Sequence, residues 1–373
     1  MNEDRSQWPS FTRLPPAVVA RYEEATRNGQ YDLNRSEQVW RDLQPTIKEQ
    51  GYQLRPRYQP DWIPSWLGTN LDPMFCEDAI RPIVPHVIDA NRTDGLVVSI
   101  KRVSKTSNEI TIGQSLSSMD LLWNPLNHCV PILDVFADPI EQDTSYIVMP
   151  HLRPFDDPEF CFIGEIIDFV GQTLQGIFFI HSNRVAHRDC TGLNIMMDGA
   201  PLYPEGFHPI RMNYSTDGVF ELKPLPRIDH PVRYYFIDFG LSTQFAPGDP
   251  PFVVGAKGRD QDVPELSCDV PYNAYKVDIF TLGNLYRKEL FEKYYNLDFL
   301  VPLIEIMTQE DPNLRPSASV AMAAFRRIHS KLDNNMSNWR LRSRNESISE
   351  RVFHGTVAVA KGGINSLIRF VGQ

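Results

Sequence analysis

Cysteine is scarce in this sequence, and long apolar runs are missing from it. The five cysteines are an odd number, lie far apart and include no C-x-x-C pair, which indicates reduced thiols in an intracellular protein. No run approaches the roughly 18 apolar residues that a membrane-spanning helix needs, and the first residues lack the layout of a signal peptide. We therefore expect a soluble protein of the cytoplasm or nucleus without a transmembrane segment.

Basic side chains are also a minority, because 37 Lys and Arg stand against 47 Asp and Glu and give a formal net charge of −10. A nucleic-acid binder dominated by phosphate contacts would be basic, so we expect no nucleic-acid partner. Gly and Pro number 21 and 30 among 373 residues, too few for a low-complexity disordered chain. The length predicts about two domains or lobes with extensions, and a chain this long needs no metal or disulfide to hold a core.

The first 80 residues form a Trp- and Pro-rich N-terminal extension. Apolar residues at roughly helical spacing predict a helix over 35–50, which Pro45 should disturb. The stretch 54–66 has a proline at about every fourth residue, so we expect it to be extended along a surface and anchored by its aromatic side chains.

The part of the chain from 81 to 335 changes from strands to helices. Between 81 and 149 the pattern predicts β runs at 95–103 and 145–150, with a helix at 108–116 between them. Apolar residues at helical spacing then predict helices at about 163–177, 276–293, 299–308 and 317–331. The sequence thus predicts an α+β fold, with a small β-rich part followed by a larger helical part.

The stretch from His187 to Asn194 is the most informative part of the sequence. Its letters, H-R-D-C-T-G-L-N, place Asp189 and Asn194 five residues apart, as in the pattern H-R-D-x-x-x-x-N. One such string could arise by chance, but five further motifs surround it in a fixed order. They are Val98-Ser99-Ile100-Lys101 upstream, and Asp238-Phe239-Gly240, Val263-Pro264-Glu265, the stretch 278–283, and Asp311-Pro312 with Arg315 and Pro316 downstream.

With these six motifs in order over 81–335, the chain resembles the eukaryotic protein kinase superfamily. Its amino-acid sequence near 187–198 and 231–241 is similar to that of a set of fungal kinase-like proteins. The resemblance implies a bilobal protein-kinase-like fold, with an N-lobe over about 81–149 and a C-lobe over about 152–335. It also implies that ATP and Mg²⁺ are the cofactors.

The resemblance assigns a role to each polar residue of the motifs. Asp189 would orient the attacking hydroxyl and accept its proton, while Asn194 and Asp238 would hold Mg²⁺ through hard oxygen ligands. Lys101 would pair with the α- and β-phosphates and would itself be held by a glutamate of the neighbouring helix. Glu109 is the candidate for that glutamate, although an acid at a helix start is also favoured by the helix dipole alone.

The resemblance also predicts an adenine site. Met149 would lie at its back, and the hinge between the lobes would begin at Pro150, which offers adenine only its C=O. Leu152 would contribute both its N–H and its C=O, and Met196 would form the apolar floor. The alternative is a β-strand that ends at Pro150 and has no role in binding adenine.

Three features depart from the pattern of the family. No G-x-G-x-x-G precedes Lys101, so ATP should bind more weakly or in another pose. Thr191 stands where serine/threonine kinases place a lysine, and the threonine that would accompany this lysine is missing before Val263. Either Lys257 or Arg259 serves as a substitute cation, or the chain binds nucleotide without transferring phosphate.

The segment after the D-F-G motif has no phosphorylation site in its middle that could pair with Arg188. Asp249, Asp260 or Asp262 could provide a fixed negative partner instead. We therefore expect any activity to be independent of phosphorylation of this segment.

Two segments lie outside the motifs. An insert at about 201–233 should project near the cleft as a surface for a partner or substrate, or it is a tolerated loop, since long loops cost little closure entropy. The C-terminal tail, 336–373, is basic and contains an amphipathic stretch at 352–371. This stretch could fold back on the acidic body, where 101–300 hold 27 acidic and 16 basic residues, or lie on an anionic surface.

These features support three functional hypotheses. The first is an ATP- and Mg²⁺-dependent protein kinase, in particular one that phosphorylates serine or threonine. The acidic charge of its body would favour basic protein substrates. The second is a pseudokinase, a nucleotide-binding scaffold with negligible transfer. The third is a small-molecule phosphotransferase of related fold, against which the peptide-side motifs at Glu265 and Arg315 count. The sequence names neither the substrate nor the oligomeric state.

Overall fold

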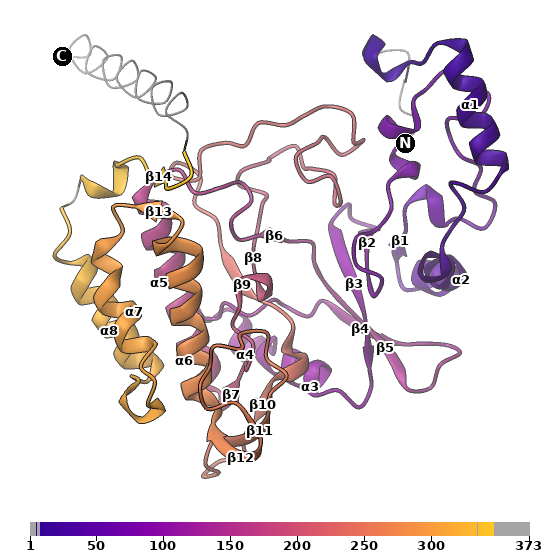
Figure 1. Cartoon of the computed structure of the whole chain (residues 1–373). Coiled ribbons are helices and arrows are strands. Elements are labelled where there is room, and N and C mark those ends of the chain that lie inside the picture. The colour runs from indigo at the N-terminus through magenta and orange to yellow at the C-terminus, as the bar shows by residue number, and fades with distance from the viewer. Residues whose placement is uncertain (1–4, 6–7, 334, 347–373) are drawn as a thin grey trace, which may run out of the picture.

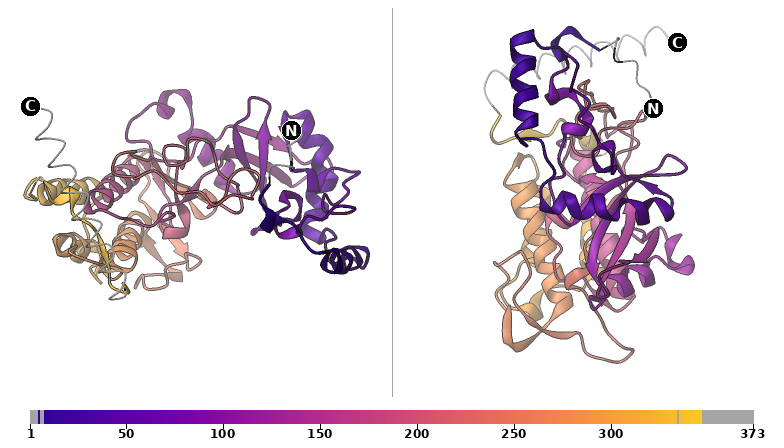
Figure 2. Two further views of the ribbon diagram at one scale, coloured as in Figure 1. Left: turned by 90° about the horizontal axis from the view of Figure 1, so that it is seen from above. Right: turned by 90° about the vertical axis from the view of Figure 1, so that its right-hand side faces the viewer.

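The computed structural model describes residues 5, 8–333 and 335–346 of the chain. It has a mixed α+β fold, as the sequence predicts, with the N-terminal segment and an antiparallel sheet at one end and a group of helices at the other (Figure 1). Figure 2 shows that the molecule is elongated along this direction when seen from above. The residues 347–373, and with them most of the predicted basic tail, lie outside the described residues.

A five-stranded antiparallel sheet forms the first part, in the order β1-β2-β3-β5-β4. Its strands are β1 (Tyr52–Gln53), β2 (Val87–Arg92), β3 (Val97–Ser104), β4 (Asp134–Ala137) and β5 (Thr144–Pro150). Lys101 lies on the central strand, opposite Val87 of β2 and Ile147 of β5. The β-branched residues of β3 and β5 suit this position, because both faces of a central strand are largely buried.

Two helices follow β3, namely α3 (Asn108–Leu116) and α4 (Met119–Leu122). The bounds of α3 are those that the sequence predicts. Its start is fixed by Ser107, whose side-chain hydroxyl accepts a hydrogen bond of 3.1 Å from the backbone N–H of Glu109. This cap places Glu109 in the first turn of α3, on the buried side facing the sheet.

In the helical part, α5 (Ile163–Ser182) packs against α8 (Ala318–His329), and α6 (Ala274–Leu285) packs against α7 (Val301–Met307). A π-helical turn, Tyr286–Phe291, continues α6. Apart from the partly buried Phe178, the large apolar residues of α5 have almost no exposed surface and form the centre of the largest hydrophobic core. By length and composition α5 could cross a membrane, but 67% of its most apolar window is buried inside the protein, as in the core helix of a globular fold.

Short strand pairs fix the loops between these helices. They are the sheet of β6 (Arg153–Pro154), β8 (Ile195–Met197) and β9 (Tyr234–Phe236), and the pairs β7 (Val185–Ala186) with β10 (Thr243–Gln244), β11 (Phe252–Gly255) with β12 (Ser267–Asn273), and β13 (Tyr294–Tyr295) with β14 (Arg342–Ser343). The last pair anchors the described part of the predicted tail on the helical part.

The N-terminal extension contains α1 (Pro16–Arg27) and α2 (Arg35–Glu49). The prediction that Pro45 disturbs the second helix is wrong, because α2 continues through it. The loss of one backbone hydrogen bond is offset by packing: Trp40 and Ile47 are buried, and the Trp40 ring lies 5.7 Å from that of Tyr146 on β5.

The stretch 54–66 is also more deeply packed than predicted. It forms turns rather than an extended surface segment, and the side chains of Tyr58 and Trp66 are 0% and 2% exposed. Just before it, β1 pairs with the end of β2 near Arg92. The domain boundary drawn after residue 80 therefore falls between two neighbouring strands of one sheet.

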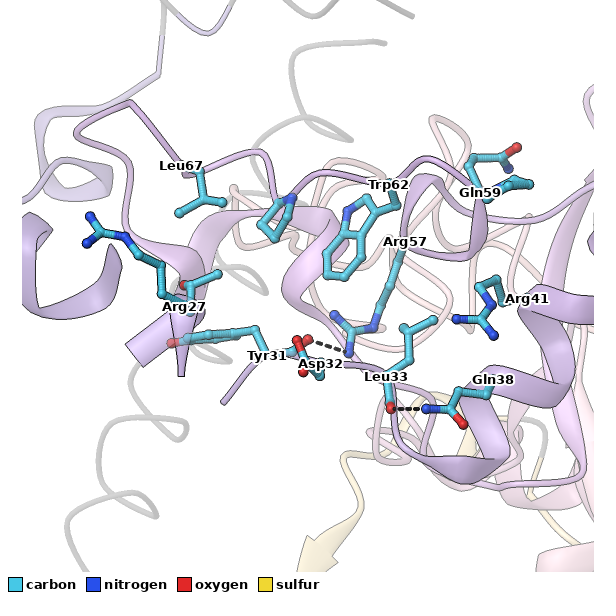
Figure 3. A pocket seen from close by; sticks show the side chains of 13 residues that line it. Arg27, Tyr31, Asp32, Leu33, Gln38, Arg41, Arg57, Gln59, Trp62 and Leu67 are labelled. Atoms are coloured by element: carbon cyan, nitrogen blue, oxygen red, sulfur yellow. Dashed lines mark hydrogen bonds between the residues drawn. The ribbon is translucent and has the colours of Figure 1, made fainter. Parts of the chain in front are cut away.

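The extension lines an open pocket of about 430 Å³. Figure 3 shows that the Trp62 ring and the Arg57 guanidinium form its inner wall, with Tyr31 and Leu33 below them. The Arg57 guanidinium lies 4.8 Å from the centre of the Trp62 ring and donates a hydrogen bond of 3.2 Å to the backbone C=O of Tyr31.

The insert at 201–233 has no regular strand or helix among its described residues, apart from a bridge between Tyr214 and Glu221. It does not project freely, because its Val219 is 2% exposed and packs in a cluster with Trp66 of the extension. The Arg211 guanidinium donates to the backbone C=O of Met74. The insert thus joins the helical part to the N-terminal extension.

Candidate active site

An ion cluster of three side chains lies between the sheet and the helical part. Lys101 on β3 donates to Glu109 on α3 over 2.6 Å and to Asp238, just after β9, over 2.8 Å. The side chains of Lys101 and Glu109 are 12% and 9% exposed, whereas that of Asp238 is 45% exposed. The cluster is therefore closed on the side of α3 and open on the side of Asp238.

The pKa values of the cluster follow from burial and pairing. Burial alone would lower the pKa of Lys101, but the carboxylates of Glu109 and Asp238 outweigh it and raise this pKa. Burial also raises the pKa of Glu109, and the Lys101 ammonium compensates only in part. For Asp238 the ammonium and the N–H of Gly240 outweigh burial, so its pKa lies below the usual value.

The loop 187–194 is held from below by a buried carboxylate of α6. The backbone N–H groups of His187 and Arg188 donate to Asp278 over 2.8 and 2.6 Å, and the His181 ring lies 2.9 Å from the same side chain. Asp278 is fully buried, so these bonds satisfy a carboxylate that would otherwise be costly. They also let Arg188 keep a positive φ of 68°.

Asp189 is fixed by two donors, one to each carboxylate oxygen. The Asn194 amide donates to Oδ2 over 2.8 Å and to the backbone C=O of Asp189 over 3.0 Å. The backbone N–H of Arg259 donates to Oδ1 over 2.9 Å. No motif of the sequence predicts this second contact, because Arg259 donates through its backbone from a loop far along the chain.

The two predicted magnesium ligands come together through β8 and β9. Ile195 pairs with Phe236, and the backbone N–H of Ile237 donates to the C=O of Asn194 over 2.9 Å. Asn194 Oδ1 and Asp238 Oδ2 accept no hydrogen bond from any described residue. One amide oxygen and one carboxylate oxygen fit Mg²⁺, which takes few protein ligands and completes its shell with water and phosphate.

The residues predicted to hold adenine lie where the chain passes from the sheet to the helical part. Met149 and Pro150 end β5, and Met196 lies on β8, with both methionines half-buried against the main core. The backbone N–H and C=O of Leu152 find no partner among the described residues. These groups remain free for a ligand, and their contact with adenine stays a prediction.

His86 was missed by the sequence interpretation. It precedes β2, and its backbone C=O accepts from the N–H of Arg102, the neighbour of Lys101. Burial and the Lys101 ammonium lower the pKa of His86, and the Asp238 carboxylate acts against them. The residue belongs to no motif, and only its position next to β3 reveals it.

Arg188 does not pair with any of the three predicted aspartates. Its guanidinium donates to the backbone C=O of Leu241 and Val254, over 3.3 and 2.9 Å, and to two hydroxyl groups. Asp260 and Asp262 instead accept from Asn284 and lie beside Lys288. Carbonyl and hydroxyl oxygens thus replace the expected fixed negative charge.

The Arg315 guanidinium donates to Glu265 over 2.8 Å and lies 4.6 Å from the centre of the Phe280 ring. This pair joins the two motifs that the sequence places after the D-F-G. It fixes the end of the segment that carries Arg259.

No family model matches the chain. Among curated proteins, it is 23% identical over 233 residues to a probable serine/threonine-protein kinase of Dictyostelium discoideum. The alignment covers 60% of this chain and 33% of that protein, so the chain spans about a third of the length of this relative. The similarity supports a kinase-like relation.

Proposed function

We propose that the chain is an ATP- and Mg²⁺-dependent protein kinase of bilobal fold that phosphorylates serine or threonine. One observation carries the proposal: four polar groups from distant parts of the sequence come together in two bonded pairs. Lys101 binds Asp238, and Asn194 binds Asp189, while β8 and β9 place the two pairs side by side.

Each group has a task in phosphoryl transfer, which depends on positioning and on neutralising negative charge. Lys101, held by Glu109, would pair with the α- and β-phosphates. Asp238 and Asn194 would hold Mg²⁺, which supplies further neutralising charge when bound. Asp189 would orient the substrate hydroxyl and take its proton.

The chemistry of the surroundings favours a protein substrate inside the cell. The bond between Arg315 and Glu265 fixes the segment beside the loop 187–194, as the peptide side of a protein kinase requires. The acidic excess in 101–300 would attract basic peptides. The resemblance of 187–198 and 231–241 to fungal kinase-like proteins is part of this proposal.

A pseudokinase is the second candidate, and the course of the chain between β1 and β2 favours it. In place of a tight glycine-rich hairpin over the phosphates, residues 54–86 leave the sheet, pack in the extension and return to β2. Backbone N–H groups that would cap the phosphates are therefore missing from this position in the described structure.

Transfer of labelled phosphate from ATP to mixed basic peptides tests the proposal. The wild type should transfer in the presence of Mg²⁺, and Asp189→Asn should lower kcat by about 100-fold or more, because the base is lost. Asp198→Asn is the matched control, since within the described part of the chain this carboxylate accepts only the N–H of Ala200 in a turn. Equal transfer by Asp189→Asn would refute the assignment. Thermal stabilisation by ATP without transfer would support the pseudokinase.

A further inference from the structure

The loop 187–194 lacks the lysine that serine/threonine kinases place two residues after the general base. Thr191 stands two residues after Asp189, and its hydroxyl is buried without a partner among the described residues. A neutral, buried hydroxyl neutralises no charge on a transferred phosphate. A positive group must reach the site from another element if transfer is to occur there.

Arg259 is the residue that the structure brings to this place. Its backbone N–H donates to Asp189 Oδ1 over 2.9 Å, so its main chain touches the proposed base directly. The preceding Gly258 packs against the loop so closely that a Cβ there would lie 3.1 Å from the backbone C=O of Arg188. The segment 258–259 is thus held against the loop 187–194.

Arg259 and Thr191 also line the same cavity, of about 600 Å³. The Arg259 side chain is exposed, and among the described residues it has no hydrogen-bond or ion-pair partner. Its acidic neighbours are engaged elsewhere, since Asp260 accepts from Asn284 over 2.8 Å and Asp262 pairs with Lys288 over 2.6 Å. The charge of Arg259 is therefore available to a ligand.

Other cations near the loop are less suited. Arg188 donates to carbonyl and hydroxyl groups of the segment 241–272 and is held there. Lys288 is paired with Asp262, and Lys257 is exposed and does not line the cavity. Among the cationic side chains of the described residues, Arg259 alone belongs to a residue that both contacts Asp189 and lines this cavity.

We infer that Arg259 binds the γ-phosphate of ATP and takes the place of the missing lysine; this inference rests on the proposed kinase function. In the step, the substrate hydroxyl oxygen forms a bond to the γ-phosphorus while the bond to the β,γ-bridging oxygen breaks. ADP leaves with that electron pair, and the hydroxyl proton goes to Asp189. The Arg259 guanidinium stabilises the negative charge on the γ-phosphoryl oxygens during the exchange.

The ratio of the Kd values for ADP and ATP, measured with Mg²⁺ by calorimetry, isolates the γ-phosphate contact. Arg259→Ala should weaken ATP binding about 10-fold and leave ADP binding unchanged. It should lower kcat for peptide phosphorylation about 100-fold or more, as the loss of one transition-state donor does. Arg326→Ala, an exposed arginine on α8, is the matched control and should change neither quantity.

A second variant tests the position itself. In Arg259→Ala with Thr191→Lys, a lysine occupies the place that the loop pattern reserves for it, so the ATP preference and kcat should return in large part. Equal ADP-to-ATP ratios in the wild type and Arg259→Ala would overturn the inference, and so would a loss seen with Lys257→Ala instead. If the wild type binds ATP but transfers no phosphate, the kinase proposal fails. The ratio of the Kd values for ADP and ATP then decides whether Arg259 binds the γ-phosphate.

Discussion

Two ion clusters of the molecule have nearly the same shortest bond and yet opposite surroundings. In the extension, Arg57 binds Glu37 over 2.6 Å, and both side chains are 0% exposed. In the candidate site, Lys101 binds Glu109 over the same 2.6 Å, but its other partner Asp238 has a side chain that is 45% exposed.

The two clusters differ in how many of their charged groups have all their hydrogen-bonding positions filled by the protein. Arg57 also donates to the backbone C=O of Asp78 and Tyr31, and Glu37 caps the start of α2 by accepting the N–H of Asn34. In the candidate site, by contrast, Asp238 Oδ2 accepts no hydrogen bond from a described residue. A closed ion pair serves the fold, whereas an open one keeps ligand positions free. Four substitutions test this contrast, from the largest expected effect to the smallest.

Breaking the closed pair should have the largest effect. Arg57→Ala leaves Glu37 buried without its cation, so we expect the free energy of unfolding to fall by about 3–5 kcal/mol. Urea denaturation measures this loss. Arg27→Ala is the control, because it breaks an i,i+4 pair with Glu23 whose arginine is 73% exposed, and it should cost about 0.3–0.5 kcal/mol. Equal losses in the two variants would contradict the contrast.

Breaking the open cluster should lower the free energy of unfolding by less, but it should abolish stabilisation by ATP and Mg²⁺. Lys101→Met leaves Glu109 buried, and this group can take up a proton because burial already raises its pKa. We expect a loss of about 1–3 kcal/mol, as for a buried polar group left without its partner. Stabilisation by ATP and Mg²⁺ in a thermal melt should disappear. If ATP still stabilised Lys101→Met as it does the wild type, the cluster would not be a nucleotide site.

The pH dependence of Glu109→Gln gives a smaller and more specific signal. Since the folded-state pKa of Glu109 is raised, its contribution to stability is complete below the unfolded pKa of about 4.3 and is lost as pH rises through the folded pKa. The free energy of unfolding of the wild type relative to Glu109→Gln should therefore fall as pH rises above about 4. An advantage that grows with pH would show that Lys101 lowers the pKa of Glu109 more than burial raises it.

The smallest effect is expected at the β2–β3 turn. Asp94 pairs with Arg92 over 2.6 Å at the surface, where their side chains are 56% and 34% exposed, and the bond to this arginine lowers the pKa of Asp94 to about 2. Asp94→Asn should leave the melting temperature unchanged at neutral pH, because water replaces the lost partner. A clear drop in the melting temperature would mean that ion pairs stabilise this protein regardless of their burial.

Local chemistry explains which elements could be predicted from the sequence. The helix 108–116 was predictable because Ser107 caps its start and apolar residues recur along it, and α5 because its apolar face repeats at helical spacing. The motifs predicted the bonds of Lys101 and Arg315 with their partners, since each motif residue points to a specific counterpart.

Contacts between distant segments could not be predicted in this way. Pro45 is tolerated because Trp40 packs on Tyr146, a residue about a hundred positions away, and no local pattern encodes this contact. The partners of Arg188 are backbone carbonyl groups, which every residue carries. For the same reason, the bond between Arg259 and Asp189 leaves no trace in the sequence.

The two residues of β1 have a consequence for how the molecule behaves in solution. Tyr52 and Gln53 cover the end of β2 near Asn91 and Arg92, so this part of the sheet edge is already paired. A chain that started at residue 81 would lose this cover together with α2, and its exposed strand would offer free N–H and C=O groups to other molecules. We therefore expect the N-terminal extension to reduce edge-to-edge aggregation at this end of β2.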